Sequence, residues 1–323
     1  MLKSQYKTLV RKYLIDNPTM STRALAEMLH FEYPDLFNTV GTARTAVRYY
    51  RGLNGNASYG LCKDPIPFTP YVPVSQRKPV YPVQLGVKGN GAIIADTHMP
   101  YHDHDAIKIA IQHIMEQGNT DFLLILGDLA DCYQESYYSR DPRLRRFPEE
   151  ITIVKEFLEE MTDIFDKVIF KFGNHERRHE TYMRYKAPDL LGIPGMDLHE
   201  IYELNKMGIR YIPWNVVIQA GKLTLLHGHE YGRSVYSPVN PARGMFLKAK
   251  SSTVSAHMHQ TSQHSENNIR GTETSCWSLG CLCDLNPEYR PLNRWNHGFA
   301  LMEFDGDQNF DIDNKRIIQG KVY

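Results

Sequence analysis

Five apolar segments of this chain each end in residues whose side chains can bind a metal ion. In one of them, the run from Phe122 to Leu126 is followed by Gly127 and Asp128. This pattern is typical of a buried parallel strand that ends at the rim of a sheet. The segments GAIIADTH, KVIFKFGNHE, KLTLLHGHE and STVSAHMHQ end in the same way, and they supply Asp96, His98, Asn174, His175, His227, His257 and His259.

These polar ends predict one shared site. The carboxyl ends of parallel strands meet at one edge of a sheet, so side chains that are distant in sequence can converge there. Two aspartates, an asparagine and several histidines exceed what one closed metal site uses, but they suit two adjacent divalent ions. We expect Asp128 to be the bridge, because one carboxylate can give an oxygen to each ion and hold the ions about 3.5–4 Å apart.

The motifs DxH, GDxxD, GNHE, HG and (G/A)HxH follow one another in this order from about residue 90 onward. This series resembles the calcineurin-like metallophosphoesterase superfamily. The resemblance implies an α/β fold, a four-layer α/β/β/α sandwich of two packed sheets covered by helices. It also implies a dinuclear enzyme in which a metal-bridging hydroxide hydrolyses a phosphate ester.

The resemblance also divides the ligands between two divalent ions. It assigns one ion to Asp96, His98 and His259, the other ion to Asn174, His227 and His257, and both ions to Asp128. Mixed nitrogen and oxygen ligands suit several metals. We expect Mn²⁺, with Fe²⁺ or Zn²⁺ as alternatives.

Three further residues have expected roles beside the ligands. His175 matches the family histidine that faces the leaving-group oxygen and donates a proton or a hydrogen bond to it. Asp131 matches the carboxylate that orients this histidine. His229, in the sequence HGHE, is expected to lie behind the ligand His227 rather than to bind metal itself.

The motifs depart from those of the protein serine/threonine phosphatases in this superfamily, which read GDxxDRG and RGNHE. Here Asp131 is followed by Cys132, and Gly173 is preceded by Phe172. We therefore expect the substrate to be a phosphodiester of nucleic acid or of a nucleotide, as in a nuclease or phosphodiesterase. A phosphomonoesterase or phosphoprotein phosphatase is one alternative, and a DNA-binding regulator with a vestigial metal site is another.

The chain divides into three parts by composition. Residues 1–55 predict three short helices, residues 56–88 are a proline-rich linker with prolines at 65, 67, 70, 73, 79 and 82, and residues 89–323 form the metallophosphoesterase domain. Ser21 is the expected N-cap of the second helix. Residues 1–60 hold eight Lys and Arg against four Asp and Glu, a net charge of plus four.

The N-terminal helices are similar to a helix-turn-helix unit, whose last helix lies in the major groove of DNA. Arg44, Arg48 and Arg51 recur at helical spacing and predict a basic outer face that contacts DNA or RNA. Such small modules also serve in docking or oligomerisation, and a row of arginines is often only a solvated face. Both interpretations stay open at this point, as does the oligomeric state.

A second basic segment, CYQESYYSRDPRLRRFP, follows the GDLAD motif. Because loops at a metal rim often determine specificity, we expect its arginines to bind a polyanionic substrate; the alternative is a solvated surface loop. These arginines are Arg140, Arg143, Arg145 and Arg146.

Composition indicates a soluble protein without a membrane partner. Apolar residues make up 42% of the chain, and 37 Lys and Arg balance 37 Asp and Glu. No run approaches the 18 apolar residues of a membrane span. The five cysteines are odd in number and lack zinc-ribbon spacing, which favours a reducing, cytoplasmic location. We expect Cys281 and Cys283 to alternate along an apolar strand as small hydrophobic residues.

Overall fold

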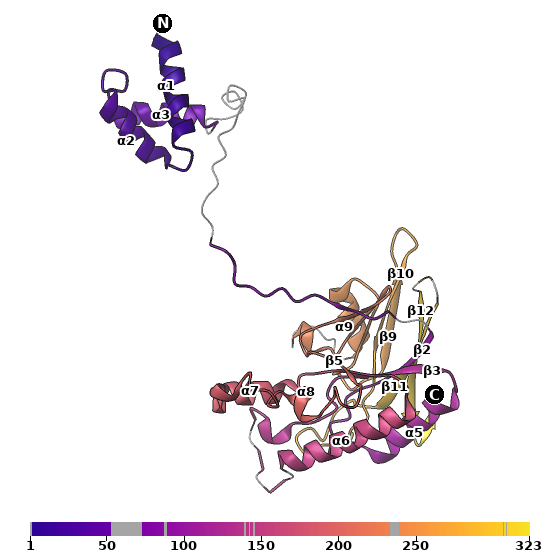
Figure 1. Ribbon diagram of the computed structural model, residues 1–323. Helices are drawn as coiled ribbons and strands as arrows, with labels where there is room; N and C mark the ends of the chain where they lie inside the picture. The colour runs from indigo at the N-terminus through magenta and orange to yellow at the C-terminus, as the bar shows by residue number, and fades with distance from the viewer. Residues whose placement is uncertain are drawn as a thin grey trace. The chain divides into compact units, whose positions relative to one another are not determined.

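The structure is a computed structural model that describes residues 2–323 apart from 53–72, 87–88, 139, 142, 145, 233–238, 306 and 308, with no side chains for residues 2–6. The chain separates into two compact units, Met1–Lys78 and Pro79–Tyr323 (Figure 1). Most of the expected linker lies outside the described residues. Each unit is described by itself.

The N-terminal unit contains the three predicted helices, α1 (Leu2–Asp16), α2 (Thr22–Glu32) and α3 (Val40–Tyr50). Helix α2 begins as predicted, because Oγ of Ser21 accepts a hydrogen bond from the backbone N–H of Ala24. The three helices bury one apolar cluster. Its members are Val10, Leu14, Leu25, Ala26, Leu29, Phe37, Ala43, Ala46 and Val47.

The second unit is built on two sheets. The seven-stranded sheet has the order β13 (Lys321–Val322), β12 (Phe310–Ile318), β11 (His297–Phe304), β2 (Gly89–Ile94), β3 (Thr120–Leu126), β4 (Val168–Lys171) and β5 (Arg210–Ile212). The six-stranded sheet has the order β1 (Val83–Gln84), β6 (Ile218–Ala220), β7 (Leu223–Leu226), β8 (Thr253–Ser255), β10 (Glu273–Ser278) and β9 (Ser262–Asn267). Strands β2 to β5 run parallel to one another, as do β7, β8 and β10.

Helices connect and cover these sheets. The longer ones are α5 (His104–Glu116), α6 (Phe147–Ile164), α7 (Arg177–Lys186) and α9 (Pro241–Ala249). Short elements are α8 (Leu198–Ile201) and the 3-10 turns η1 (Tyr133–Glu135), η2 (Pro188–Leu190) and η3 (His229–Tyr231). Helices α5 and α6 are the crossovers from β2 to β3 and from β3 to β4 (Figure 1).

Successive side chains along β3 point to opposite faces of the seven-stranded sheet, so each face is packed against a different layer of the domain. Leu123 and Ile125 face α5 and α6, where they pack in one core with residues such as Ile107 and Leu158. Leu124 points to the opposite face, into the core between the two sheets. On the outer side of the six-stranded sheet, α9 packs on β10. The predicted α/β/β/α sandwich is therefore confirmed.

Three local features differ from the sequence-based expectation. Strand β1 lies within the range expected for the linker and pairs with β6. Helix α7 was not expected, because its sequence RRHETYMRYK is strongly polar. Strand β10 ends at Ser278, so Cys281 and Cys283 do not alternate along it; each forms only an isolated bridge in the segment that follows.

Candidate metal centre

Both sheets deliver the predicted ligands at the carboxyl ends of their strands. Asp96 and His98 follow β2, Asp128 follows β3, His227 follows β7, and His257 and His259 follow β8. The backbone is left-handed, with positive φ between 49° and 69°, at all of these residues except His227. This conformation is uncommon for residues with a side chain and clusters at functional sites. The chain thus turns sharply after each strand and brings these side chains together.

Two glycines make room for the convergence. A Cβ at Gly173 would lie 2.2 Å from Oδ1 of Asp128 and 2.7 Å from its backbone nitrogen. A Cβ at Gly127, where φ is +93°, would lie 2.4 Å from Nδ1 of His227. Neither position can accommodate a side chain without displacing the centre, which explains the glycine in the GD and GN motifs.

Asp128 occupies the middle of the site. Its Oδ2 lies 3.1 Å from Nε2 of His227 and 3.9 Å from Nε2 of His98, which belong to the two expected ligand sets. Its Oδ1 instead accepts a hydrogen bond of 2.9 Å from the backbone N–H of His175. A single oxygen therefore faces both sets, where we had expected one oxygen for each ion.

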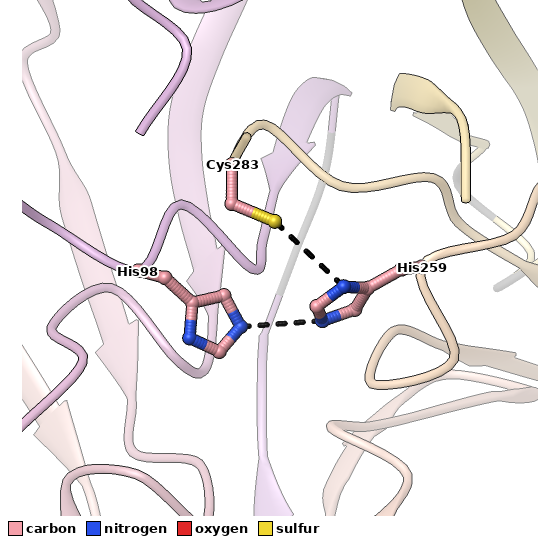
Figure 2. A group of neighbouring side chains, drawn as sticks. All are labelled: His98, His259 and Cys283. Atoms are coloured by element: carbon pink, nitrogen blue, oxygen red, sulfur yellow. Dashed lines mark hydrogen bonds between the residues drawn. The ribbon is translucent and has the colours of Figure 1, made fainter. Parts of the chain in front are cut away.

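The first ligand set surrounds Oδ1 of Asp96. Nε2 of His259 lies 3.4 Å from this oxygen, and Nε2 of His98 lies 3.9 Å from it. The two Nε2 atoms are 3.2 Å apart and point toward each other (Figure 2). Because imidazole nitrogens are either donors or acceptors, a proton or a cation must lie between them.

The second ligand set lies on the other side of Asp128. Nitrogen atoms of His227 and His257 and an oxygen of Asp128 lie within 4.8 Å of one another. Nδ1 of His227 lies 2.8 Å from the carbonyl oxygen of Leu126 and donates to it, which leaves Nε2 for a metal. Asn174 follows β4 in the loop that contains Gly173.

Several buried atoms of this centre have no hydrogen-bond partner within the described part of the chain. They include Oδ1 of Asp96, Oδ1 of Asn174 and Nε2 of His227. Leaving a buried polar atom unsatisfied costs about 1–3 kcal/mol. Oδ1 of Asp96 and Nε2 of His227 are 3.9 Å apart. Two such atoms this close together fit a bound cation, and the nitrogen and oxygen chemistry of the centre suits Mn²⁺, Fe²⁺ or Zn²⁺.

The ligand histidines fall into two groups, one with a lowered and one with a raised pKa. Burial, together with the neighbouring charge of His227, lowers the pKa of His257 to about 3. Burial alone would also lower the pKa of His227 and of His259, but the nearby carboxylates raise these values to about 9 and about 10. His257 is thus neutral at pH 7, whereas a metal must displace protons from the other two.

His175 lies beside the ligands and is held by Asp131. Its Nδ1 is 3.0 Å from Oδ1 of Asp131, and its Nε2 is 3.8 Å from Oδ2 of Asp128. Burial would raise the pKa of Asp131, but the charge of His175 lowers it well below the usual range. The carboxylate is therefore ionised. Nδ1 of His175 donates its hydrogen bond to the backbone carbonyl oxygen of Asp131, 2.9 Å away, so that Nε2 faces the metal centre.

Glu176, the last residue of GNHE, joins two motif loops. Its carboxylate accepts hydrogen bonds from the backbone N–H groups of Asp128, Ala130 and Gly173, at 3.0, 3.0 and 2.7 Å. Burial raises its pKa to about 6. The sequence did not suggest a role for this residue; the structure makes it the brace that fixes Asp128 relative to the GNHE loop.

Two residues that contact His259 were not anticipated as parts of the site. Sγ of Cys283 lies 3.7 Å from Nδ1 of His259 (Figure 2), whereas Asp96 faces Nε2 of the same ring. The ring centroid of Trp295 lies 4.2 Å from that of His259. Both come from the segment after β10, so only the tertiary fold brings them here. Cys283 is a buried thiol at the metal centre rather than a strand residue.

His229 lies near the second ligand set. Its ring centroid is 5.4 Å from that of His227, and burial lowers its pKa to about 4. Neither of its ring nitrogens has a hydrogen-bond partner among the described residues. The neutral imidazole packs against His227 and Trp214, and its nitrogen atoms are available to a water or a ligand.

The described members of the predicted substrate arginines have their polar partners in or next to their own segment. Arg143 forms an ion pair of 2.6 Å with Asp141, Arg146 lies 4.0 Å from Glu149, and both side chains are more than 80% exposed. Arg140 donates to the carbonyl oxygen of Gln134. Arg145 lies outside the described residues. The solvated-loop alternative fits Arg143 and Arg146 better than a site in contact with the metals.

The arginine row of α3 is also shorter than expected. Arg44 and Arg48 are exposed. Arg51, in contrast, donates from Nη1 to Oγ1 of Thr22 at 2.7 Å and from Nη2 to the carbonyl oxygen of Met20. Its guanidinium therefore ties the end of α3 to the start of α2, and it does not belong to an outward-facing row.

The sequence model of a protein family described as calcineurin-like phosphoesterase matches residues 92–282 of the chain. This range includes every residue of the centre described above except Cys283 and Trp295. No curated protein matches the chain. Among the residues that the structure describes, no helix has both the length and the apolar character needed to span a bilayer.

Proposed function

Because the chain belongs to the calcineurin-like phosphoesterase family and is a metal-dependent phosphoester hydrolase, we propose that it hydrolyses phosphodiesters of nucleic acid or of nucleotides. The observation that carries the proposal is the shared Oδ2 of Asp128, which lies between His98 and His227. A centre of this kind suits a pair of divalent ions, and we propose that both are Mn²⁺.

In this proposal the bound ions supply a nucleophile from water and neutralise charge on the phosphoryl oxygens. Asp96, His98 and His259 would hold one ion, Asn174, His227 and His257 would hold the other, and Asp128 would contact both. His175 acts on the leaving group: its Nε2 faces the centre and donates a proton or a hydrogen bond to the departing oxygen. Asp131 orients this imidazole through Nδ1 and stabilises its charged form.

The preference for nucleotide diesters is supported by the rim of the centre. Trp295 packs beside the ligand His259, Arg290 lies 5.8 Å above the Trp295 ring, and Tyr289 is 77% exposed. Aromatic side chains with arginine suit stacked bases and their phosphates. In the protein phosphatase motifs GDxxDRG and RGNHE, two arginines stand where this chain has Cys132 and Phe172. Both of these residues are buried in the core, which disfavours phosphoproteins as substrates.

The remaining parts of the proposal concern the partner and the compartment. Arg44 and Arg48 on the exposed side of α3 would contact the backbone of long DNA or RNA, and the phosphodiester would then reach the metal centre. The four described cysteines are free, buried thiols, which supports a reducing cytoplasmic location.

A turnover panel with added Mn²⁺ tests the substrate class. It compares bis(p-nitrophenyl) phosphate, p-nitrophenyl phosphate, a cyclic nucleotide, single-stranded DNA, duplex DNA and a phosphopeptide. We expect kcat/KM for at least one diester to exceed that for the monoester and the phosphopeptide by tenfold or more. A preference for the monoester or phosphopeptide would overturn the diester assignment, and DNA binding without any turnover would favour a regulator.

A further inference from the structure

We propose that Arg178 binds the phosphoryl group of the substrate by exchanging its contact with His175 for contacts with phosphoryl oxygens. The inference rests on the proposed phosphoesterase function and concerns a residue of α7 that lies just beyond the GNHE motif. It starts from the atoms that the guanidinium touches.

Arg178 reaches the catalytic pair with both ends of its guanidinium. Nη1 donates to the carbonyl oxygen of Asp131 at 2.7 Å and lies 3.6 Å from Oδ2 of the same residue. Nη2 lies 3.0 Å from Nε2 of His175. The side chain is 21% exposed, so the guanidinium is held at the edge of the centre and remains accessible to a ligand.

The contact with His175 cannot persist during the reaction. A guanidinium only donates hydrogen bonds, so Nε2 of His175 must be the acceptor, and the imidazole proton is then on Nδ1, beside Asp131. The same Nε2 is the atom that must face the leaving-group oxygen. A bound substrate therefore replaces Nη2 at this nitrogen. Nε2 takes up a proton from water before it donates to the leaving oxygen, and the released N–H groups of Arg178 require a new acceptor.

The phosphoryl oxygens are the acceptors that suit these donors. Arginine presents planar pairs of N–H groups that match phosphate geometry. Nη1 can remain anchored on the carbonyl oxygen of Asp131 while Nη2 turns to the substrate. The buried positions Cys132 and Phe172 provide no cation, and Arg143 and Arg146 pair within their own surface segment. Arg178 is the arginine that contacts both His175 and Asp131.

The position of Arg178 is fixed by its neighbours on α7. Glu176 is the N-cap residue of α7, and its side chain braces the loops of Asp128 and Gly173. Arg177 turns the other way and stacks on Trp214, with its Cζ 3.9 Å from the ring centroid. The two adjacent arginines therefore have different surroundings, and only Arg178 contacts the catalytic pair.

The test uses the full-length, Mn²⁺-loaded protein with Arg178→Met and Arg178→Lys. Arg184→Met serves as the control, because Arg184 lies on the same helix, is 64% exposed and pairs with Glu180. Inorganic phosphate binding is measured by calorimetry, KM and kcat are measured with bis(p-nitrophenyl) phosphate, and bound metal is counted. Phosphate binding requires no turnover, so it tests Arg178 even if the diester proposal fails.

We expect Arg178→Met to weaken phosphate binding and to raise KM by about 10- to 100-fold, with two metals retained. Arg178→Lys keeps a cation that can still reach Asp131, so it should fold and give an intermediate loss of at least about fivefold. Arg184→Met should match the wild type. Unchanged phosphate affinity and KM in the Lys variant, with or without a loss of kcat, would overturn the proposal and leave Arg178 as a positioning residue for His175.

Discussion

Oδ1 of Asp131 lies 3.1 Å from Nδ1 of His98 and so braces a residue of the first ligand set. The sequence had linked Asp131 only to His175, from which the same oxygen is 3.0 Å away. One carboxylate thus holds a proposed metal ligand and the proposed proton donor in a fixed relation. Carboxylates in such positions keep Nδ1 protonated and direct Nε2 to the metal.

We therefore expect Asp131→Asn to affect metal binding as well as chemistry. Loss of the charge should lower Mn²⁺ affinity by about 10- to 100-fold, the usual effect of removing a carboxylate behind a ligating histidine. The turnover number, kcat, should also fall when metal is saturating. Mn²⁺ titration and steady-state kinetics check both effects, with Asp141→Asn in the exposed loop as the control. Unaltered metal affinity would limit Asp131 to His175.

Asp128→Asn should remove the metal pair. Oδ2 of Asp128 lies 3.1 Å from His227 and 3.9 Å from His98, which belong to the two ligand sets, and a neutral amide cannot hold two divalent ions together. We expect fewer than two ions per chain and no measurable turnover. Metal analysis of the dialysed protein gives the stoichiometry, and circular dichroism verifies the fold. Two bound ions together with activity would be incompatible with a bridging carboxylate.

His175→Ala should retain both metals and lose most of kcat, by about 10²–10⁴-fold. The loss reflects the missing proton or hydrogen bond at the leaving oxygen. It should therefore shrink for nitrophenolate esters, which leave readily without protonation, and be larger for alkyl or nucleoside leaving groups. Kinetics with a series of leaving groups checks this dependence. An equal loss across the series would argue against an acid at this position.

Much of this centre could be predicted because its signals are local in sequence. The runs before Asp96, Asp128 and Asn174 are apolar and end abruptly, and parallel strands bring such ends together. Helices α5 and α6 carry a similarly local signal, because their buried apolar residues recur at helical spacing. The four-layer order then follows from strands such as β3, which are apolar on both faces.

The contacts that sequence could not provide depend on the tertiary fold. Arg178 lies on a helix with a strongly polar sequence, and Cys283 reaches His259 from 24 residues further along the chain. Arg51 shares helical spacing with Arg44 and Arg48, yet it turns inward because Thr22 and Met20 offer acceptors there. The spacing of residues along the sequence determines which side chains share one face of a helix. It does not determine which hydrogen-bond partners the tertiary fold brings to them.

Glu150 should make the folded protein less stable as the pH rises. Burial raises its pKa to about 8 from the ordinary value of 4.5, although Oε1 accepts a 2.6 Å hydrogen bond from the backbone N–H of Cys132. Between these two values the folded state holds a proton that the unfolded state has lost. This contribution to stability is complete below about pH 4.5 and is lost as the pH rises toward 8.

Glu150→Gln removes this titration while its side-chain oxygen can still accept from Cys132. We expect the variant to raise Tm at pH 8 by at least about 2–4 °C, which corresponds to about 1 kcal/mol in a domain of this size. The difference should vanish near pH 4.5. Thermal unfolding across this range checks it, with the more exposed neighbour Glu149→Gln as the control. A difference that does not vary with pH would contradict a protonated Glu150.

The N-terminal unit should matter only for long substrates. It has its own apolar core and belongs to a separate compact unit, so deleting residues 1–60 should leave hydrolysis of a small diester unchanged.

Arg44→Ala with Arg48→Ala should reduce the salt slope of DNA binding by about 1.4–1.8, since each phosphate contact contributes about 0.7–0.9. Arg51 is left intact because it holds α3 to the α2 region. Arg23→Ala, which removes one exposed arginine paired with Glu27, is the control. Binding measured against salt for the full chain, the deletion and both arginine variants decides the role: equal slopes in all four proteins would make the unit a docking or oligomerisation module.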